Sequence, residues 1–232
     1  MANIGSYPLN EIITGDSRLL AQSIPDNSID MIFTDPVYEN IEDYAWLAET
    51  AARILKPNRA LVAFYYPKFH LQVGNAMSQH LTYQEMIIWH RNNEMKFRYS
   101  PVGKSVYVPA YVFSKGEKLN RPGFAFNLRS YPVWSVDSNH KWSKPPEFLA
   151  YYLEALSRVG EVVYEPFAGG GSMLSVCKQF ERNFISSEIL PETADIARKN
   201  LLQTMFPLGL GRSLTKRAAD NGNAAPQFEA FE

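Results

Sequence analysis

The sequence lacks the features that would place it in several common classes. Its single cysteine, Cys177, permits no internal disulfide and no site of paired cysteines. No apolar run approaches the ~18 residues of a membrane span, and Met1–Pro8 has neither the basic nor the apolar part of a signal peptide. The four histidines share no ligand spacing, so no metal site is expected. These absences predict a metal-free protein of the cytoplasm with no membrane partner.

A strong charge of either sign is also lacking, because 23 basic and 24 acidic residues leave a net charge of -1. The balance is uneven along the chain, since residues 90–145 hold ten Lys and Arg against three acids. A basic segment in an otherwise acidic chain suits a nucleic-acid partner. It is equally typical of a solvated, lysine-rich loop region, and charge alone leaves both interpretations open.

What the sequence does contain is an alternation of short apolar runs with stretches of helical periodicity. This alternation predicts an α/β fold with a doubly wound, mostly parallel sheet. The expected strands are 10–14, 31–34, 60–64, 82–89, 110–114, 162–165 and 183–188, of which 82–89 and 110–114 are predicted to pair as a hairpin. The expected helices are 41–55, 67–79, 145–158, 172–180 and 191–204.

The same pattern predicts one domain over residues 1–206 and a flexible tail over 207–232, where small and polar residues dominate. Periodicity fades in 91–108 and again in 116–139, which are basic and carry interleaved aromatic residues. Long loops inside a compact domain usually serve a function. We expect these two segments to be a small insertion that recognises the target.

A glycine-rich turn joins a predicted strand to a predicted helix at residues 165–172. Glycines let a ligand approach the backbone closely, and the free N–H groups at a helix start favour an anionic group. Glu188 follows the next strand, where a carboxylate can hold a ribose. The turn therefore predicts a pocket for a nucleoside-containing cofactor. Leu174 stands where a dinucleotide fingerprint needs its third glycine, which disfavours a nicotinamide-dependent oxidoreductase.

A second turn, Asp35-Pro36-Val37-Tyr38, ends another predicted buried strand. The amine of a nucleobase is a poor nucleophile because its lone pair is conjugated into the ring. It improves when both N–H bonds meet acceptors, and the Asp35 carboxylate and the Pro36 carbonyl are two such acceptors. Tyr38 is suited to stack on a base taken out of the duplex. This chemistry requires no metal.

With these motifs in this order, the chain resembles the amino-methyltransferases of DNA in their permuted, β-class arrangement, in which a D-P-P-Y motif precedes an F-x-G-x-G motif. Further stretches match: Thr14–Ser17, Trp46–Pro57, His140–Pro145 and Arg182–Ile189. The resemblance covers residues from about 10 to 201. It implies a circularly permuted, Rossmann-like methyltransferase fold, S-adenosylmethionine as cofactor, DNA as partner, and a bacterial or phage origin without a fused restriction partner.

The resemblance also implies roles for individual residues. The catalytic turn would be Asp35, Pro36, Val37 and Tyr38. The cofactor would be bound by Asp16, Ser17, Asp35, Lys144, Pro145, Glu165, Pro166, Phe167, Ala168, Gly169, Gly170, Gly171, Ser172 and Glu188. Among these, Asp16 would face the adenine, and Lys144 with Pro145 would lie near the methionine end. Aspartate at the head of the catalytic motif favours the N6 amine of adenine.

Basic residues of the two predicted recognition segments, and Lys141 just after the second, are expected to bind DNA: Arg91, Lys96, Arg98, Lys104, Arg121, Arg129 and Lys141. The shortness of these segments predicts a short target or reliance on a homodimer. Val37 replaces the usual second proline of the catalytic motif. This substitution leaves open a catalytically impaired module that binds cofactor and DNA. A cytosine-N4 methyltransferase stays open as well, because the aspartate favours adenine but not absolutely.

Overall fold

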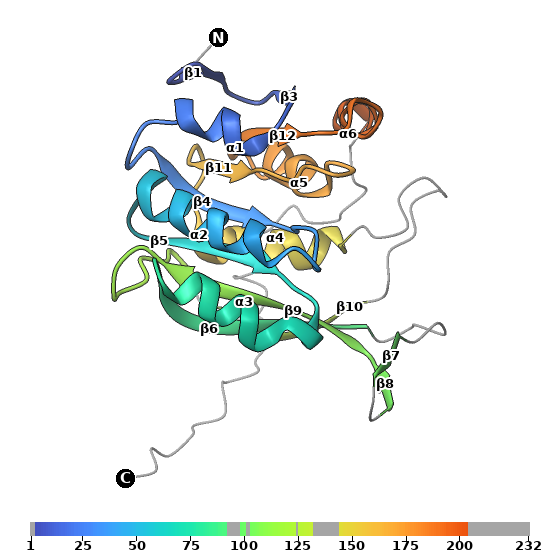
Figure 1. Ribbon diagram of the computed structural model, residues 1–232. Coiled ribbons are helices and arrows are strands. Elements are labelled where there is room, and N and C mark those ends of the chain that lie inside the picture. Colours follow the sequence, from blue (N-terminus) through green and yellow to red (C-terminus); the bar gives the residue numbers. More distant parts are fainter. Residues whose placement is uncertain (1–2, 92–97, 101–102, 124, 132–143, 204–232) are drawn as a thin grey trace.

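The computed structural model describes residues 3–91, 98–100, 103–123, 125–131 and 144–203. These residues form an eight-stranded sheet in the order β10-β6-β9-β5-β4-β11-β12-β3 (Figure 1). The strands are β3 (Ile12–Thr14), β4 (Ile29–Thr34), β5 (Leu55–Phe64), β6 (Thr82–Arg91), β9 (Tyr107–Ser114), β10 (Leu128–Tyr131), β11 (Val162–Glu165) and β12 (Asn183–Glu188). Within this sheet only β9 runs antiparallel to its neighbours, so the sheet is mostly parallel, as predicted.

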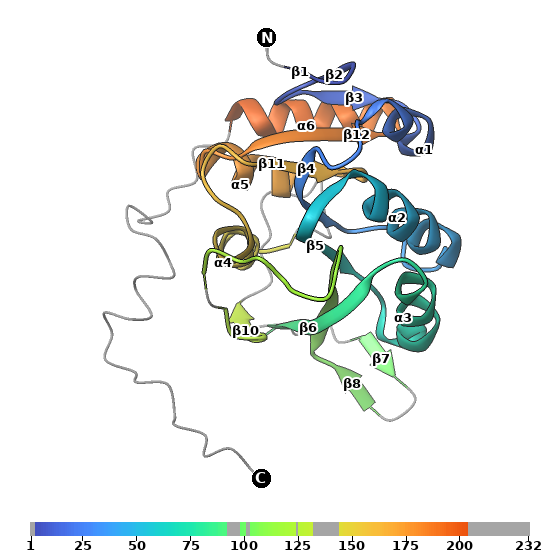
Figure 2. The ribbon, with the colours of Figure 1, turned by 90° about the vertical axis from the view of Figure 1, so that its left-hand side faces the viewer.

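Helices cover both faces of the sheet, which confirms the doubly wound arrangement (Figure 2). Strand side chains alternate between two cores, so that Met31 and Phe33 of β4 pack on one face while Ile32 packs on the other. One face carries α1 (Ser17–Leu20), α2 (Ile41–Ile54) and α3 (His70–Ser78), and the other carries α4 (Pro146–Leu156), α5 (Ser172–Gln179) and α6 (Pro191–Gln203).

Most predicted elements are confirmed with shifts of a few residues at their ends. The largest shift concerns the strand predicted over 60–64, because β5 already begins at Leu55 and contains Pro57. The predicted hairpin is also confirmed, since β6 and β9 pair antiparallel from Thr82↔Ser114 to His90↔Tyr107. The short helices η1 (Ala21–Ser23) and η2 (Pro67–Phe69) complete the helical elements of the described residues.

Two segments predicted as loops contain strands. Residues 91–108 include the antiparallel pair β7 (Arg98–Ser100) and β8 (Gly103–Ser105), and residues 116–139 include β10, which pairs in parallel with the end of β6. The prediction was wrong there because β10 is an edge strand of four residues without an apolar run. A further pair, β1 (Asn3–Ile4) with β2 (Tyr7–Pro8), precedes the sheet. The predicted tail over 207–232 lies outside the described residues.

Candidate active site

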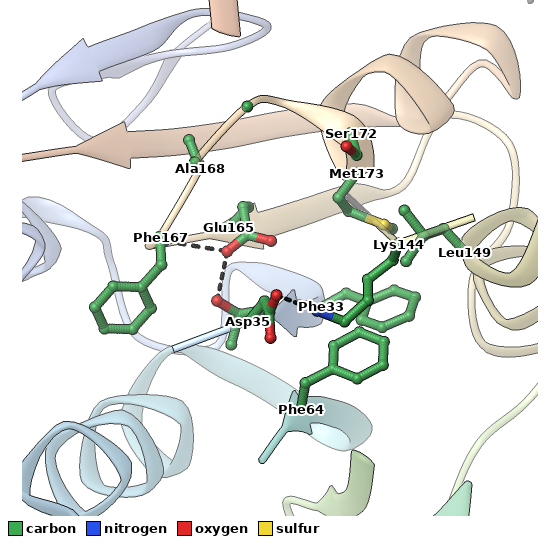
Figure 3. Close-up of a pocket in the computed structure, with 13 residues that line it drawn as sticks. Phe33, Asp35, Phe64, Lys144, Leu149, Glu165, Phe167, Ala168, Ser172 and Met173 are labelled. Carbon is green, nitrogen blue, oxygen red and sulfur yellow. Dashed lines mark hydrogen bonds and ion pairs between the residues drawn. The ribbon is translucent and has the colours of Figure 1, made fainter. Parts of the chain in front are cut away.

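The two predicted motif turns lie side by side because their strands are parallel neighbours. Strands β4 and β11 pair through Met31↔Val163 and Ile32↔Tyr164, so their carboxyl ends reach the same edge of the sheet. A pocket of about 260 Å³ opens there, lined by both turns (Figure 3). Its lining residues are Phe33, Thr34, Asp35, Phe64, Lys144, Leu149, Glu165, Phe167, Ala168, Gly169, Gly170, Ser172 and Met173. Ligand sites of open α/β sheets lie at such edges.

The glycine turn has a backbone that requires glycine at its last position. Gly171 has φ 77° in the left-handed region, and a Cβ built there would lie 3.2 Å from Ala197 of α6. Gly169 also has a positive φ of 49°. Helix α5 begins directly after this turn, so its first N–H groups point toward the pocket edge where Gly170 and Ser172 lie. The turn therefore presents bare backbone to a ligand.

Glu188 is the last residue of β12, and Asp16 follows the neighbouring strand β3 by two residues; neither lines the pocket itself. The Glu188 carboxylate accepts hydrogen bonds from the backbone N–H of Gly169, at 2.9 Å, and of Leu190, at 3.0 Å. Asp16 caps α1 by accepting a hydrogen bond from Arg18 N at 2.8 Å. In this conformation both carboxylates organise the loops around the glycine turn.

Ser17 and Pro166, two further predicted cofactor residues, are joined behind the glycine turn. The buried Ser17 hydroxyl donates to the Pro166 carbonyl at 2.5 Å, and Ser187 of β12 donates to the same carbonyl at 3.3 Å. Pro145 precedes α4 and its carbonyl accepts a hydrogen bond from Phe148 N. Ser17, Pro166 and Pro145 position the pocket wall and do not line the pocket.

Asp35 and Lys144 form an ion pair inside the pocket, although they are 109 positions apart in the chain. The Lys144 ammonium donates to Asp35 Oδ2 and to the Tyr38 hydroxyl, which lies 3.1 Å away. Asp35 Oδ1 is buried and accepts no hydrogen bond from any residue that the structure describes. The catalytic turn thus holds one satisfied and one unsatisfied carboxylate oxygen. The turn closes through a hydrogen bond from Asn40 N to the Val37 carbonyl, at 3.2 Å.

Glu165 is a second acid in the pocket, and its environment differs from that of Asp35. Its side chain is buried and accepts hydrogen bonds from Thr34 Oγ1 and from Phe167 N (Figure 3). Burial raises the pKa of the Glu165 carboxyl well above its ordinary value, against the lowering effect of these hydrogen bonds. Burial therefore favours the neutral form of the Glu165 carboxyl, which ties the end of β4 to the glycine turn.

Several pocket residues were not predicted from the sequence. Phe33 and Thr34 are the last two residues of β4, and Phe64 is the last residue of β5. Leu149 and Met173 lie in the first turns of α4 and α5. Phe33, Thr34 and Phe64 could have been predicted from their position at the carboxyl ends of parallel strands, where ligands bind in such sheets.

The predicted DNA-binding residues lie in different surroundings. Arg91 is 8% exposed and donates to the Ser105 carbonyl. The Arg129 guanidinium lies over the Tyr151 ring, 4.4 Å from its centre. Arg121 is exposed and donates to the Gly123 carbonyl. Arg98 and Lys104 belong to β7 and β8, whereas Lys96 and Lys141 lie outside the described residues. Their contact with DNA stays a prediction.

Metal-binding clusters and membrane spans are both missing from the described part of the chain. No group of three or more His, Cys, Asp or Glu side chains is arranged there to hold a metal ion. None of the helices in those residues is both long and apolar enough to cross a membrane.

Comparison with known families matches residues 29–199 to the family of N6/N4 methyltransferases described as DNA methylase. Type II methyltransferase M.HpaI of Haemophilus parainfluenzae is 26% identical over 82% of this chain and 73% of its own length. M.BamHI of Bacillus amyloliquefaciens is 24% identical over 78% of this chain. The matched part covers 55% of the length of M.BamHI.

Solved structures share the fold. The cytosine-N4-specific PvuII DNA methyltransferase has a TM-score of 0.73 and 18% identity, with 94% of each chain covered. The putative DNA modification methylase TTHA0409 of Thermus thermophilus, complexed with S-adenosyl-L-methionine, has a TM-score of 0.67 and 18% identity, covering 82% of this chain and 92% of that one. The fold and the site define a methyltransferase-like α/β protein. Because the family match spans well over half of the sequence, this chain belongs to the N6/N4 DNA methylase family.

Proposed function

We propose that this protein transfers a methyl group from S-adenosylmethionine to the N6 amine of adenine in DNA, after the target base has left the helix. The family, the pocket beside the glycine turn and the unsatisfied Asp35 carboxylate oxygen support this proposal. DNA methylases must extrude a base to reach its amine, because the amine is paired inside the duplex.

The residues of the glycine turn fit the cofactor. Gly169 and Gly170 line the pocket without side chains, and the start of α5 offers N–H groups to an anion. Phe167 contributes an aromatic face, which packs edge-on against Trp46 at 6.1 Å between ring centres. When bound, S-adenosylmethionine supplies an electrophilic methyl group. Glu188 ends β12, and Asp16 follows the adjacent strand β3, next to the turn. Glu188 would hold the ribose hydroxyls of the cofactor and Asp16 its adenine amine.

The observation that carries the proposal is the buried, unsatisfied Asp35 Oδ1 at the pocket edge. A buried acceptor without a donor is costly, so its retention indicates a group that arrives with a ligand. The target amine is such a donor. Asp35 Oδ1 and the Pro36 carbonyl would accept its two N–H bonds, which localises the lone pair on nitrogen. The amine would then accept the methyl group that the cofactor's sulfonium supplies, with the sulfur keeping the electrons of the broken bond, and Asp35 Oδ1 would take the proton that the nitrogen loses.

Adenine rather than cytosine is proposed because an aspartate heads the catalytic turn. The proposal assigns DNA contact to the basic residues of 91–108 and 116–139, whose side chains would neutralise phosphates. Val37 does not argue for an inactive module, because the turn that contains it is closed by the Asn40–Val37 hydrogen bond.

The test is transfer of labelled methyl groups from S-adenosylmethionine to unmethylated DNA, followed by digestion and nucleoside analysis. N6-methyladenine is the expected product. N4-methylcytosine in its place would establish the alternative specificity. Binding of S-adenosylmethionine by calorimetry, without labelled nucleoside on duplex or single-stranded DNA, would support the impaired module instead. Mapping of the modified positions in DNA from cells that express the protein then identifies the target.

A further inference from the structure

The ammonium of Lys144 lies on the side chains that the proposed function assigns to the target base. Its Nζ donates to Asp35 Oδ2 and lies 4.6 Å from the centre of the Phe64 ring (Figure 3). The same Nζ donates to the Tyr38 hydroxyl at 3.1 Å. Lys144 is only 7% exposed. It is therefore a buried part of the pocket wall and not a surface lysine.

This placement imitates the interactions expected for a target amine. A nitrogen with N–H bonds meets a carboxylate and lies near two aromatic rings, 5.7 Å from the centre of the Tyr38 ring and 4.6 Å from that of the Phe64 ring. An extruded base that reached Asp35 and Tyr38 would need the same space. Methyl transfer also moves positive charge onto the amine nitrogen, and a neighbouring ammonium would oppose this charge. Lys144 on Asp35 Oδ2 therefore stands beside the Oδ1 position proposed for the target amine, and its charge and volume oppose an amine reacting there.

The pocket extends from Asp35 and Lys144 to Gly169 and Gly170, so a cofactor bound at the glycine turn would bring its methionine end close to Lys144. That end carries a carboxylate, which competes for the ammonium. The other acid of the pocket does not compete, because the Glu165 side chain is buried and engaged by Thr34 and Phe167 N.

We propose that Lys144, through its contacts with Asp35 Oδ2 and Tyr38, blocks the space beside Oδ1 that the target amine needs in the free protein, and that the carboxylate of the bound cofactor draws it off Asp35. This inference rests on the proposed function, and it makes Lys144 a positioning residue that enforces an order in which cofactor binds before the base. Until the cofactor arrives, Asp35 Oδ2 and Tyr38 remain engaged by Lys144. Afterwards the same lysine holds the cofactor and leaves the catalytic turn open.

The test compares two ligands that differ by one carboxylate, S-adenosylhomocysteine and its decarboxylated analogue. Both are titrated by calorimetry into the full chain and into three variants, Asp35→Asn, Lys144→Met and the double variant. Asp35→Asn frees Lys144, so S-adenosylhomocysteine should bind about fivefold more tightly, with the analogue unchanged. Lys144→Met should weaken S-adenosylhomocysteine about tenfold and again leave the analogue unchanged. In the double variant the gain from Asp35→Asn should disappear.

Two further variants serve as controls. Lys144→Arg should keep the preference for the carboxylate, because arginine retains the charge. Lys56→Met removes a lysine that also pairs with an aspartate, at the opposite edge of the sheet, and should change neither affinity. Equal effects of Lys144→Met on both ligands, or no gain from Asp35→Asn, would overturn the role of Lys144. Failure of the unmodified protein to bind S-adenosylhomocysteine would instead contradict the proposed function, and the inference with it.

Discussion

Strand β4 has an aspartate–lysine pair near each end, and the two pairs differ in how completely the carboxylate is satisfied. Near the amino end, Asp30 Oδ1 pairs with Lys56 at 2.7 Å and Arg59 at 3.4 Å, and Oδ2 accepts from Val162 N at 3.0 Å. Just past the carboxyl end, Asp35 Oδ2 pairs with Lys144, while Oδ1 accepts nothing from the described residues.

The difference indicates that the Asp30–Lys56 pair stabilises the fold, whereas the Asp35–Lys144 pair is available to a ligand. Asp30 is 3% exposed, and its partners come from β5 and from the start of β11, so it joins three strands in one network. Asp35 borders a pocket, and its buried Oδ1 accepts no hydrogen bond from the described residues. A buried polar network stabilises a fold when every member is paired, and an unpaired member is a cost that a bound ligand can remove.

Replacement of Asp35 by Asn should have the largest effect, and it should fall on catalysis. We expect a loss of about 10³-fold in kcat, because the amide keeps an acceptor oxygen but lacks the negative charge that stabilises the positive charge developing on the amine. The free energy of unfolding should change little. Single-turnover methyl transfer and urea denaturation measure the two quantities. Turnover close to that of the unmodified protein would remove Asp35 from the proposed role.

Replacement of Asp30 by Ala should show the opposite pattern. The buried Arg59 and the Val162 N–H lose an acceptor, so the free energy of unfolding should fall by about 3 kcal/mol. The kcat of the folded fraction should stay the same. Asp26→Ala is the matched control, because Asp26 pairs with Arg53 at the surface and should contribute less than about 1 kcal/mol. Equal destabilisation by both variants would contradict a larger contribution of the Asp30 network to stability.

Gly171→Ala should lower both stability and cofactor affinity. Its φ of 77° should cost about 1–2 kcal/mol with any Cβ, and the added carbon meets Ala197 at 3.2 Å. Gly160→Ala is the control, because Gly160 has φ 81° but open space around a Cβ. Both variants should lose stability in thermal unfolding, yet only Gly171→Ala should weaken S-adenosylhomocysteine binding. A matching loss of affinity in Gly160→Ala would indicate a global effect.

Val37→Pro should have the smallest effect. Proline would restrict the catalytic turn and raise kcat by no more than about fivefold, because the Asn40–Val37 hydrogen bond already closes it through a carbonyl that proline retains. Steady-state methylation of both proteins on the same DNA measures this. A gain of several hundredfold would show that the natural turn is impaired and would revive the non-catalytic alternative.

Much of the fold could be predicted because its central strands are short, apolar and bounded by clear turns. The expected strands 162–165 and 183–188 coincide with β11 and β12, and the helix predicted over 172–180 differs from α5 by one residue. Strand β10 was missed because an edge strand with alternating exposed residues has little apolar signal. The hairpin of β7 and β8 was missed because strands of only three residues are too short to show a periodic apolar pattern.

The sequence by itself determined the two turns at the strand ends, because Asp35-Pro36 and the glycines of 169–171 act through local backbone geometry and their position after apolar runs. Only the tertiary structure decided what those turns meet. The pairing of Lys144 with Asp35, the burial of Glu165 against Thr34 and the unsatisfied Asp35 Oδ1 all join residues from separate elements. Hydrogen bonding and burial depend on distances between such elements, and no spacing along a chain encodes these distances directly.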